Sequence, residues 1–285
     1  MSGTLFVCGT PIGNLGDISR RLEEVLGQVD LVAAEDTRRS SQLLNHLGIR
    51  KSLVSYHEHN LRKSGEALLE KLKSGLSVAL VSDAGMPGIS DPGEVLIQSC
   101  IQEGIRVELV AGPVAGIHAL ILSGLPTERF AFEGFPDRNK KTRRAQFEAL
   151  AKDERTLIFY EAPHRLEATL KDLLECFGNR RVAVARELTK RYEEFVRGTI
   201  SEAIRHFEVE SPKGEFVIVL AGLDPVEAAA ANAALALAET PDEETILLEI
   251  RSRVNEGMSR KDAAAEVAGL YKLSKKEVYR LSTLV

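Results

Sequence analysis

The feature that most constrains the fold is a regular alternation, from the first residues, of short apolar runs with segments of helical periodicity. Apolar runs of this length, bounded by turn residues, are typical of buried strands. One run, Val78–Val81, is apolar throughout, which indicates the centre of a parallel sheet covered on both faces. The alternation predicts an α/β, doubly wound sheet. Its strands are expected at Thr4–Cys8, Leu31–Ala34, Leu53–Tyr56, Val78–Val81 and Val107–Val110.

Helices are expected between these strands, and capping residues indicate their ends. Asp17 is expected to cap the first helix, which should end at Gly27. Asp91 followed by Pro92 has the pattern of an N-cap and a first-turn proline, which predicts a helix start there. The later helices of this half are predicted at Thr37–Leu47, Arg62–Lys73, Pro92–Gln102 and Val114–Leu122.

A boundary is predicted at the turn sequence Gly124-Leu125-Pro126, which divides an α/β part at 1–125 from a second α/β part at 126–223. The later strands of the second part follow one another through short links, so its sheet should be mixed or antiparallel. Its strands are expected at Phe130–Glu133, Leu157–Glu161, Val182–Arg186, Phe195–Thr199 and Phe216–Leu220. Its helices are expected at Thr142–Ala151, Arg165–Phe177 and Glu202–Glu208.

The last part of the chain, 224–285, is predicted to be helical. The alanine-rich segment Ala228–Ala238 is expected to be a helical linker. Ser259 and Ser274 stand at expected N-caps, and Gly257 and Gly269 are expected to end helices. Short helices with tight turns predict a helix-turn-helix type bundle, with helices at Glu243–Asn255, Arg260–Leu270 and Lys275–Leu281.

Bulk properties exclude several classes of protein. No apolar run has the length of a membrane span, and the apolar part of the N-terminal segment is too short for a signal peptide. The 3 cysteines are far apart and odd in number, so a disulfide framework and a zinc site are both disfavoured. We therefore expect a cytosolic protein. The formal net charge of −5 restricts contact with nucleic acid to local basic patches.

Glycine-rich turns follow three of the predicted strands, where doubly wound sheets bind nucleotides. The turn Gly9–Asn14 matches neither the dinucleotide pattern nor a Walker loop, and alone it is equally compatible with a structural turn. The turn Ser82–Gly93 is long for a strand-to-helix link, and its glycines let backbone approach a ligand closely. Asp83 in this turn could hold ribose hydroxyls or face a cationic sulfonium. The third turn is Gly112–Gly116.

Charged residues gather after three other strands. Arg38 and Arg39 fall in a first helical turn, where cations oppose the helix dipole, so a functional role is favoured over a solvated pair. The segments Phe159–Arg165 and Ala185–Glu194 place charges at strand ends. Such charges are typical of a cleft, although surface ion-pair networks have the same pattern.

Two further features have competing interpretations. The segment Arg138–Arg144 holds five cations and no acidic residue, so it could contact RNA phosphate or be a solvated turn. The terminal helices are also rich in lysine and arginine. His57 and His59 could suggest a metal pair, but with no third ligand nearby they are expected to be ordinary polar histidines.

These segments together resemble the tetrapyrrole methylase superfamily of S-adenosylmethionine-dependent methyltransferases. The resemblance covers nearly all of Leu5–Leu220, and Met86 stands where the family more often has threonine. Within the superfamily, the segments are most similar to the branch that methylates the ribose 2′-oxygen of a cytidine in 16S rRNA of the small ribosomal subunit. The matching stretches, in order, are TPIGNLGDIS, AEDTR, VSDAGMPGISDPG, AGP, FYEAPHR, ARELTK and GEFVIV.

The resemblance implies a two-domain α/β fold with a small C-terminal helical domain, a homodimer, no metal, and S-adenosylmethionine held between the α/β parts. Two rivals stay open: a tetrapyrrole methyltransferase of the same fold and a non-catalytic RNA-binding assembly factor. The cofactor-binding residues implied are Pro11, Gly13, Asn14, Ser82, Asp83, Ala84, Gly85, Ile89, Pro113 and Val114. The residues implied around the ribose are Glu35, Asp36, Arg38, Glu187 and Lys190, with Asp36, Glu187 and Lys190 as candidate bases.

Overall fold

The computed structural model describes residues 2–224, 226, 243–271 and 273–283. These residues form two compact units, Met1–Gly222 and Leu223–Val285. The predicted division of the first unit at residues 125 and 126 remains a prediction. The predicted helical linker Ala228–Ala238 lies outside the described residues.

The N-terminal half of the first unit is built on a five-stranded sheet in the order β3-β2-β4-β1-β5. All neighbouring strands are parallel, and Val81 of β4 aligns with both Cys8 of β1 and Ala34 of β2. The β4 strand is central and fully buried, as its apolar sequence predicted. The strands are β1 (Thr4–Cys8), β2 (Leu31–Ala34), β3 (Ser52–Ser55), β4 (Val78–Val81) and β5 (Arg106–Val110).

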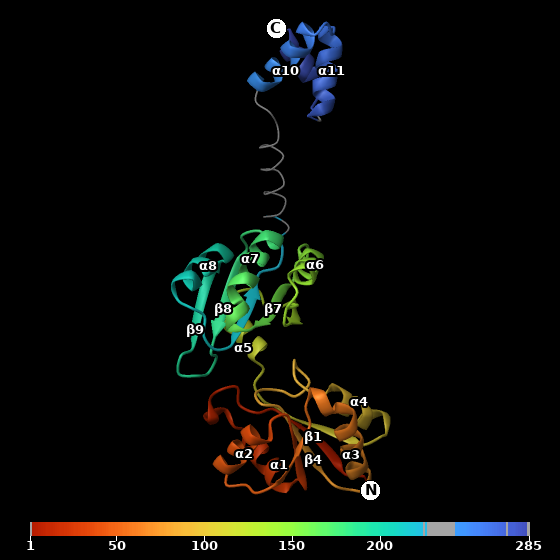
Figure 1. Cartoon of the computed structure of the whole chain (residues 1–285), viewed down its shortest axis with the longest axis vertical. Coiled ribbons are helices and arrows are strands. Elements are labelled where there is room, and N and C mark those ends of the chain that lie inside the picture. The colour runs from red at the N-terminus through yellow and green to blue at the C-terminus, as the bar shows by residue number, and fades with distance from the viewer. Residues whose placement is uncertain (1, 225, 227–242, 272, 284–285) are drawn as a thin grey trace. The chain divides into compact units, whose positions relative to one another are not determined.

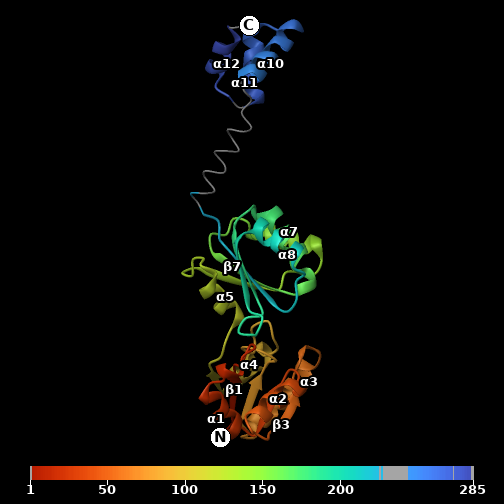
Figure 2. The ribbon, with the colours of Figure 1, turned by 90° about the vertical axis from the view of Figure 1, so that its left-hand side faces the viewer.

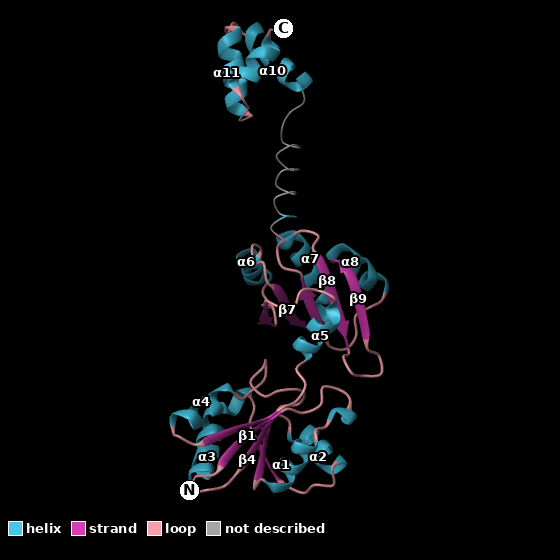
Figure 3. Cartoon of the chain, turned by 180° about the vertical axis from the view of Figure 1, so that it is seen from behind, coloured by secondary structure: helices cyan, strands magenta, loops and turns pink. Residues whose placement is uncertain are grey.

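Helices cover both faces of this sheet (Figures 1 and 3). Alternate strand residues face opposite sides, so Leu5 packs with α3 and α4, whereas Cys8 packs with α1 and α2. Each large side chain fully buried in these layers contributes about 1.5–3 kcal/mol to folding. The helical elements are η1 (Leu15–Asp17), α1 (Arg20–Gln28), α2 (Thr37–His46), η2 (Glu58–Asn60), α3 (Leu61–Lys73), α4 (Glu94–Gln102) and α5 (Ala115–Ser123).

The starts of two helices differ from the sequence prediction. Asp17 lies in η1, and the side chain of Ser19 caps α1 instead, accepting a hydrogen bond from the Leu22 N–H. Asp91 does not cap α4, because Gly93 occupies the N-cap position of that helix. Gly27 does not end α1, which continues to Gln28. The signals at Asp17, Gly27 and Asp91 were wrong because a competing turn or cap lies one or two residues away from each.

The second half of the first unit has a five-stranded mixed sheet, as predicted, and its strand order is β6-β7-β10-β8-β9. The β6 and β7 strands are parallel, and the other neighbouring pairs are antiparallel. Its β10 strand is buried at every position. The strands are β6 (Phe130–Gly134), β7 (Thr156–Glu161), β8 (Arg181–Arg186), β9 (Glu194–Thr199) and β10 (Phe216–Leu220).

One face of this second sheet packs against α6, α7 and α8, and the other face packs against α5 (Figure 2). Phe147 and Phe159 lie in the first of these cores, with their ring centroids 5.5 Å apart in an edge-to-face arrangement. The helical elements are α6 (Lys140–Leu150), η3 (Pro163–Arg165), α7 (Leu166–Phe177) and α8 (Ile200–Val209).

The second unit contains a helical bundle with its own apolar core around Ile250 and Val267. Ser259 caps α11, as predicted, whereas Ser274 makes no side-chain capping bond to α12 and Gly269 lies inside α11. Among the residues that the structure describes in both units, no helix combines the length and apolarity that a membrane crossing needs. The bundle helices are α10 (Glu243–Asn255), α11 (Arg260–Leu270) and α12 (Lys275–Ser282).

Candidate active site

The three glycine-rich turns lie side by side at the carboxyl edge of the first sheet. Backbone hydrogen bonds of 2.9 and 3.0 Å join Thr10 and Gly85 in an isolated antiparallel bridge. Gly9 and Gly112 approach so closely that a Cβ built on either would lie 2.6 Å from the Cα of the other. A side chain at either position would therefore force the turns apart.

These turns form one wall of a cavity of about 390 Å³, within the range of about 300–1,000 Å³ that is typical of small-molecule sites. The other wall comes from the second sheet, from the end of β7, the 188–190 segment and the start of β10. Both apolar side chains and carboxylates line the cavity. Its lining residues include Ile12, Glu35, Arg39, Asp83, Ala84, Gly85, Met86, Ile89, Asp91, Val114, Phe135, Tyr160, Glu161, Lys190 and Glu215.

The structure places the predicted cofactor residues in three groups. The group that lines the 390 Å³ cavity comprises Asp83, Ala84, Gly85, Ile89 and Val114. Pro11, Gly13 and Ser82 instead line a second cavity of about 310 Å³, of which Arg39 and Asp83 also form part of the wall. Asn14 and Pro113 line neither cavity.

Asp83 joins the turn after β4 to the segment after β2. Its Oδ1 accepts a hydrogen bond of 2.9 Å from the backbone N–H of Asp36, and its Oδ2 lies 3.4 Å from the guanidinium of Arg39. Both oxygens are therefore occupied by protein groups. Asp83 orders the cavity wall, and less of its hydrogen-bonding capacity is left for a ligand than its sequence context suggested.

Arg39 reaches the site, whereas the predicted Arg38 does not. The Arg38 side chain is 88% exposed and pairs with Asp36. Arg39 follows one residue later, about 100° further around α2, and lines both cavities. The sequence signal, two cations in a first helical turn, marked both residues, but only the orientation of the helix separates them.

The predicted residues around the ribose are divided in the same way. Glu35 and Lys190 line the cavity, whereas Asp36, Arg38 and Glu187 do not. The ammonium of Lys190 lies 2.9 Å from carboxylate oxygens of both Glu187 and Glu215. The segment carrying these residues has left-handed backbone at Glu187, with φ 49°, and it packs directly on Gly13.

These partners set the charge of the three candidate bases. Hydrogen bonds to the Arg38 side chain and backbone lower the pKa of Asp36 to about 2. Burial raises the pKa of Glu187, but hydrogen bonds from Lys190 and the Glu215 backbone outweigh it, so the net shift is downward. Burial lowers the pKa of Lys190, but its two carboxylate partners leave it raised. Two weakly basic carboxylates and a protonated amine are poor proton acceptors near neutral pH.

Two carboxylates in the cavity, Glu35 and Asp91, have raised pKa values. Burial, followed by the nearby charge of Asp83, raises the pKa of Glu35. Burial, followed by the charge of Glu35, raises the pKa of Asp91 to about 7. Asp91 was missed because the following proline made it a helix cap in the sequence analysis. No pattern within one segment could have revealed it, because the groups that act on it come from other segments.

The segment Phe159–Arg165, which the sequence left undecided, contributes to the cavity wall. The hydroxyl of Tyr160 accepts a hydrogen bond of 3.0 Å from the Gly116 N–H, which connects β7 to α5. Glu161 is buried and accepts a hydrogen bond of 2.6 Å from the Thr169 hydroxyl. Phe135, which is 54% exposed, packs edge-to-face on Tyr160 and offers a ring to the cavity.

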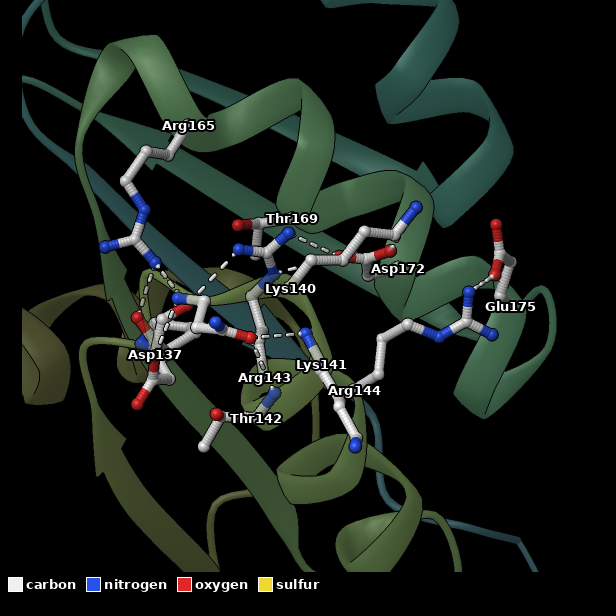
Figure 4. Close-up of polar contacts among 12 residues, drawn as sticks. Asp137, Lys140, Lys141, Thr142, Arg143, Arg144, Arg165, Thr169, Asp172 and Glu175 are labelled. Atoms are coloured by element: carbon white, nitrogen blue, oxygen red, sulfur yellow. Dashed lines mark hydrogen bonds and ion pairs between the residues drawn. The ribbon is translucent and has the colours of Figure 1, made fainter.

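The basic segment Arg138–Arg144 is partly neutralised in the folded chain (Figure 4). Arg143 is buried and donates hydrogen bonds of 2.9 and 2.5 Å to Asp172 of α7, and Arg144 pairs with Glu175. Lys140 lies 3.8 Å from Asp172 and is 67% exposed. The cations have no acidic neighbour within their own segment, but α7 supplies two acidic partners, Asp172 and Glu175. Arg138 and Lys141 are exposed.

Among the described residues, one cluster has ligand types and spacing that could suit a metal ion: Glu194, His206 and Glu210. The His206 Nε2 lies 2.9 Å from Glu194 and 3.9 Å from Glu210. Arg186 pairs with the other oxygen of Glu194 at 3.2 Å, so this acid already has protein partners. None of the three lines the cavity. The predicted absence of a metal remains a prediction.

The cavity suits the cofactor that the sequence implied. The carboxylate of Asp83 matches a sulfonium, and the apolar residues of the cavity match an adenosine ring system. Gly85, which lines the cavity, has φ 82°, a left-handed conformation that glycine adopts without strain. The residues present therefore fit S-adenosylmethionine.

The sequence profile of the Tetrapyrrole (Corrin/Porphyrin) Methylases matches residues 4–204. The chain therefore belongs to the tetrapyrrole methylase family of methyltransferases. Its two α/β sheets resemble crystal structures of diphthine synthase, with a TM-score of 0.59 at 16% identity, covering 77% of this chain and 90% of that one. They also resemble uroporphyrin-III-C-methyltransferase from Thermus thermophilus, with a TM-score of 0.56 at 20% identity, covering 76% and 94%. At these identities the likeness shows the fold alone.

Curated relatives are more similar in sequence and share one name, Ribosomal RNA small subunit methyltransferase I. The protein from Synechocystis sp. is 46% identical over 98% of this chain and 97% of its own length. That from Bacillus subtilis is 42% identical over 97% and 93%. That from Thermotoga maritima is 50% identical over 77% of this chain, and the aligned part makes up 99% of the relative.

Proposed function

We propose that this protein transfers the methyl group of S-adenosylmethionine to the ribose 2′-oxygen of a cytidine in 16S rRNA of the small ribosomal subunit. The observation that carries the proposal is the 46% identity to a ribosomal RNA small subunit methyltransferase I over 98% of this chain. The 2′-oxygen and the cytidine rest on the sequence resemblance. The cavity is consistent with a ribose oxygen as the acceptor, because its carboxylates could accept protons from ribose hydroxyls.

We assign cofactor binding to the turns that line the large cavity. When bound, S-adenosylmethionine supplies an electrophilic methyl on a sulfonium, which is already an activated leaving group. Asp83, fixed by Asp36 and Arg39, holds negative charge at the wall. Gly85 and Val114 bring backbone close to the ligand, and Ile89 provides apolar surface. Their rigid placement orients the reactants and excludes water.

We assign the substrate ribose to the side of the cavity formed by Glu35 and Lys190. Lys190 is held by two carboxylates, so its ammonium is fixed in position and available to orient a phosphate or a hydroxyl. The second cavity shares Arg39 and Asp83 with the first and is also lined by Pro11, Gly13 and Ser82. Neighbouring nucleotides could be accommodated there.

The decisive experiment supplies the purified protein with isotopically labelled S-adenosylmethionine and small ribosomal subunits from a deletion strain that lacks this protein. Mass spectrometry of the digested 16S rRNA is expected to show one new 2′-O-methylcytidine. Protein-free 16S rRNA and a uroporphyrinoid serve as parallel substrates. Methyl transfer only to the tetrapyrrole, or cofactor binding without transfer to RNA, would overturn the proposal.

We further propose a cytoplasmic homodimer whose RNA contacts come from the exposed cations of Arg138–Arg144 and from the C-terminal bundle. Arg260, Lys261, Lys275 and Lys276 of the bundle are all exposed. The part of the chain aligned with the Thermotoga maritima relative is 77% of this chain but 99% of that protein. We therefore expect the bundle to aid substrate binding rather than chemistry. A chain truncated after Leu223 should keep its affinity for the cofactor and lose affinity for subunits. Light scattering tests the dimer.

A further inference from the structure

We propose that Asp91 is the catalytic base that accepts the proton of the attacking ribose hydroxyl. The inference rests on the function proposed above and adds to it the residue that carries the proton. Asp91 lines the cavity beside the residues assigned to the cofactor. Asp91 is not among the candidate bases that the sequence indicated. The partners of Asp36 and Glu187 make these two carboxylates weakly basic, and the partners of Lys190 keep it protonated.

The hydrogen bonds and ion pairs of the carboxylates that line the cavity leave two candidates for the base, Asp91 and Glu35. Both oxygens of Asp83 are taken by Asp36 and Arg39. Glu161 is buried and accepts from the Ala162 N–H and the Thr169 hydroxyl. Glu215 is 77% exposed and pairs with Lys190. A carboxylate that already accepts strong hydrogen bonds binds a further proton weakly. Asp91 and Glu35 remain as candidates.

The charges that act on Asp91 come from more parts of the cavity wall than those that act on Glu35. The charges that act most strongly on Asp91 are Glu35 after β2, Asp83 after β4 and Glu215 before β10, so they come from both walls. It also acts on Tyr160 of β7, and the nearby Ser82 side chain lowers the pKa of Asp91. The three charged groups that act on Asp91, namely Glu35, Asp83 and Glu215, are all carboxylates. Glu35, by contrast, faces the cation Arg39, together with Asp83 and His57, all from the first half of the chain.

The local backbone explains why this carboxylate is available. The preceding Ser90 has φ 61°, a left-handed conformation that is unusual for a residue other than glycine. The chain turns there, and α4 begins only at Glu94. Asp91 is therefore released from the capping role that its sequence position indicates. Backbone strain that persists beside a cavity is often part of a functional site.

The proposed step is balanced without any further reactant. The 2′-oxygen forms a bond to the methyl carbon while the carbon–sulfur bond breaks, and the electron pair of that bond remains on sulfur. The hydroxyl proton passes from the 2′-oxygen to a carboxylate oxygen of Asp91. The products are the 2′-O-methyl ether, the neutral thioether and protonated Asp91, which returns its proton to water.

The carboxylate environment gives the step a pH dependence. Burial and the surrounding negative charges raise the pKa of Asp91 to about 7, which places its proton affinity close to the working pH of a cytosolic enzyme. Below about pH 7 the group is protonated and cannot accept a second proton. The kcat/KM for RNA should therefore rise with pH and level off above this value.

The test compares Asp91→Asn with the wild type on small ribosomal subunits across pH 5.5–8.5, a window of about one to two units on either side of the expected transition. General-base catalysis contributes about 10²–10⁴-fold to rate, so kcat should fall by about a hundredfold or more, and the pH-dependent limb should disappear. Asp91→Glu should recover part of the rate. Glu35→Gln tests the competing carboxylate, and Asp153→Asn, in the loop before β7, is the matched control outside the cavity.

A readout independent of turnover comes from the carboxyl carbon resonances of the protein labelled with ¹³C-aspartate. The resonance lost in Asp91→Asn should titrate near pH 7 in the wild type. Cofactor affinity, measured by calorimetry, should be almost unchanged in this variant. If Asp91→Asn does not fold, Asp91→Ser replaces it and the wild-type titration is assigned with that variant.

The outcomes separate this inference from the proposed function. An inactive wild type refutes the proposed function. An active wild type with full turnover in Asp91→Asn refutes the role of Asp91 and leaves the function standing. Loss of the pH limb in Glu35→Gln alone would transfer the role to Glu35. Loss of cofactor affinity in Asp91→Asn, with turnover kept at saturating cofactor, would make Asp91 a cofactor ligand and overturn the proposal.

Discussion

The cavity and the contact between α6 and α7 hold carboxylates in opposite ways. In the cavity, Asp91 is surrounded by other carboxylates, which raise its pKa. Between the two helices, the more deeply buried Asp172 meets the buried guanidinium of Arg143 at 2.5 Å and has Lys140 within 3.8 Å (Figure 4). The pairing of Asp172 with Arg143 contributes to stability, whereas the carboxylates around Asp91 keep that group able to bind a proton.

The difference shows that a charged residue cannot be assigned a role from its sequence neighbours. Arg143 belongs to the most basic segment of the first unit, yet it is a structural partner of α7. Asp91 belongs to what resembles a helix start, yet it lies in the cavity. Four experiments test this contrast between paired and unpaired charge.

The largest effect is expected from Arg143→Met. Removing the arginine leaves Asp172 buried without its main partner, and breaking a buried pair in this way typically costs about 3–5 kcal/mol. Urea denaturation should show this loss, whereas Lys141→Met, on the exposed side of α6, should stay within about 0.5 kcal/mol. The double variant Arg143→Met/Asp172→Leu should regain most of the stability. A single variant as stable as the wild type would show that the pair is not structural.

A smaller loss is expected from Thr169→Val. The Thr169 hydroxyl donates a hydrogen bond of 2.6 Å to the buried Glu161, and hydrogen bonds to charged groups contribute about 1.5–3 kcal/mol. The methyl group of valine replaces the hydroxyl at nearly the same volume, so packing should change little. Thr142→Val, on the exposed surface of α6, is the matched control. Equal denaturation midpoints for both variants would contradict the assignment of Glu161 as a buried, hydrogen-bonded carboxylate.

Asp91→Asn should stabilise the protein at high pH while it impairs catalysis. The pKa of Asp91 is raised from 3.8 to about 7, so the native state binds this proton more tightly than the unfolded state. The wild type therefore loses stability as the pH rises from about 4 to about 7. Because the group is partly solvated, we expect asparagine to gain only about 1 kcal/mol at pH 8, and nothing at pH 4. A gain that is independent of pH would contradict the linkage.

The smallest effect concerns RNA affinity. Lys141→Ala removes an exposed cation, and loss of one phosphate contact should make the slope of log affinity against log salt shallower by about 0.7–0.9. The double variant Arg143→Met/Asp172→Leu removes a neutralised cation and should leave the slope unchanged. Filter binding with small subunits at several salt concentrations measures both. The same slope for the wild type and Lys141→Ala would exclude this segment from phosphate contact.

The sequence predicted the two sheets and the glycine-rich turns that line the 390 Å³ cavity. Strand bounds such as Thr4–Cys8 and Val78–Val81 agree with the structure residue for residue, because periodicity and turn residues act within a few positions of the chain. Helix starts were less predictable where two capping residues competed, as at Asp17 and Ser19. Of the residues predicted around the ribose, Glu35 and Lys190 line the cavity, and Asp36, Arg38 and Glu187 lie outside it.

By itself, the sequence determined the α/β architecture, the gathering of glycine turns at one edge of the first sheet, and the family to which the chain belongs. These properties follow from local conformational preferences and from the rule that parallel strands end at a common edge. The tertiary structure alone decided that Arg143 pairs with Asp172 and that the charge of Glu35 acts on Asp91. Coulomb and desolvation energies depend on distance and burial in space, which the order of residues in the chain does not specify.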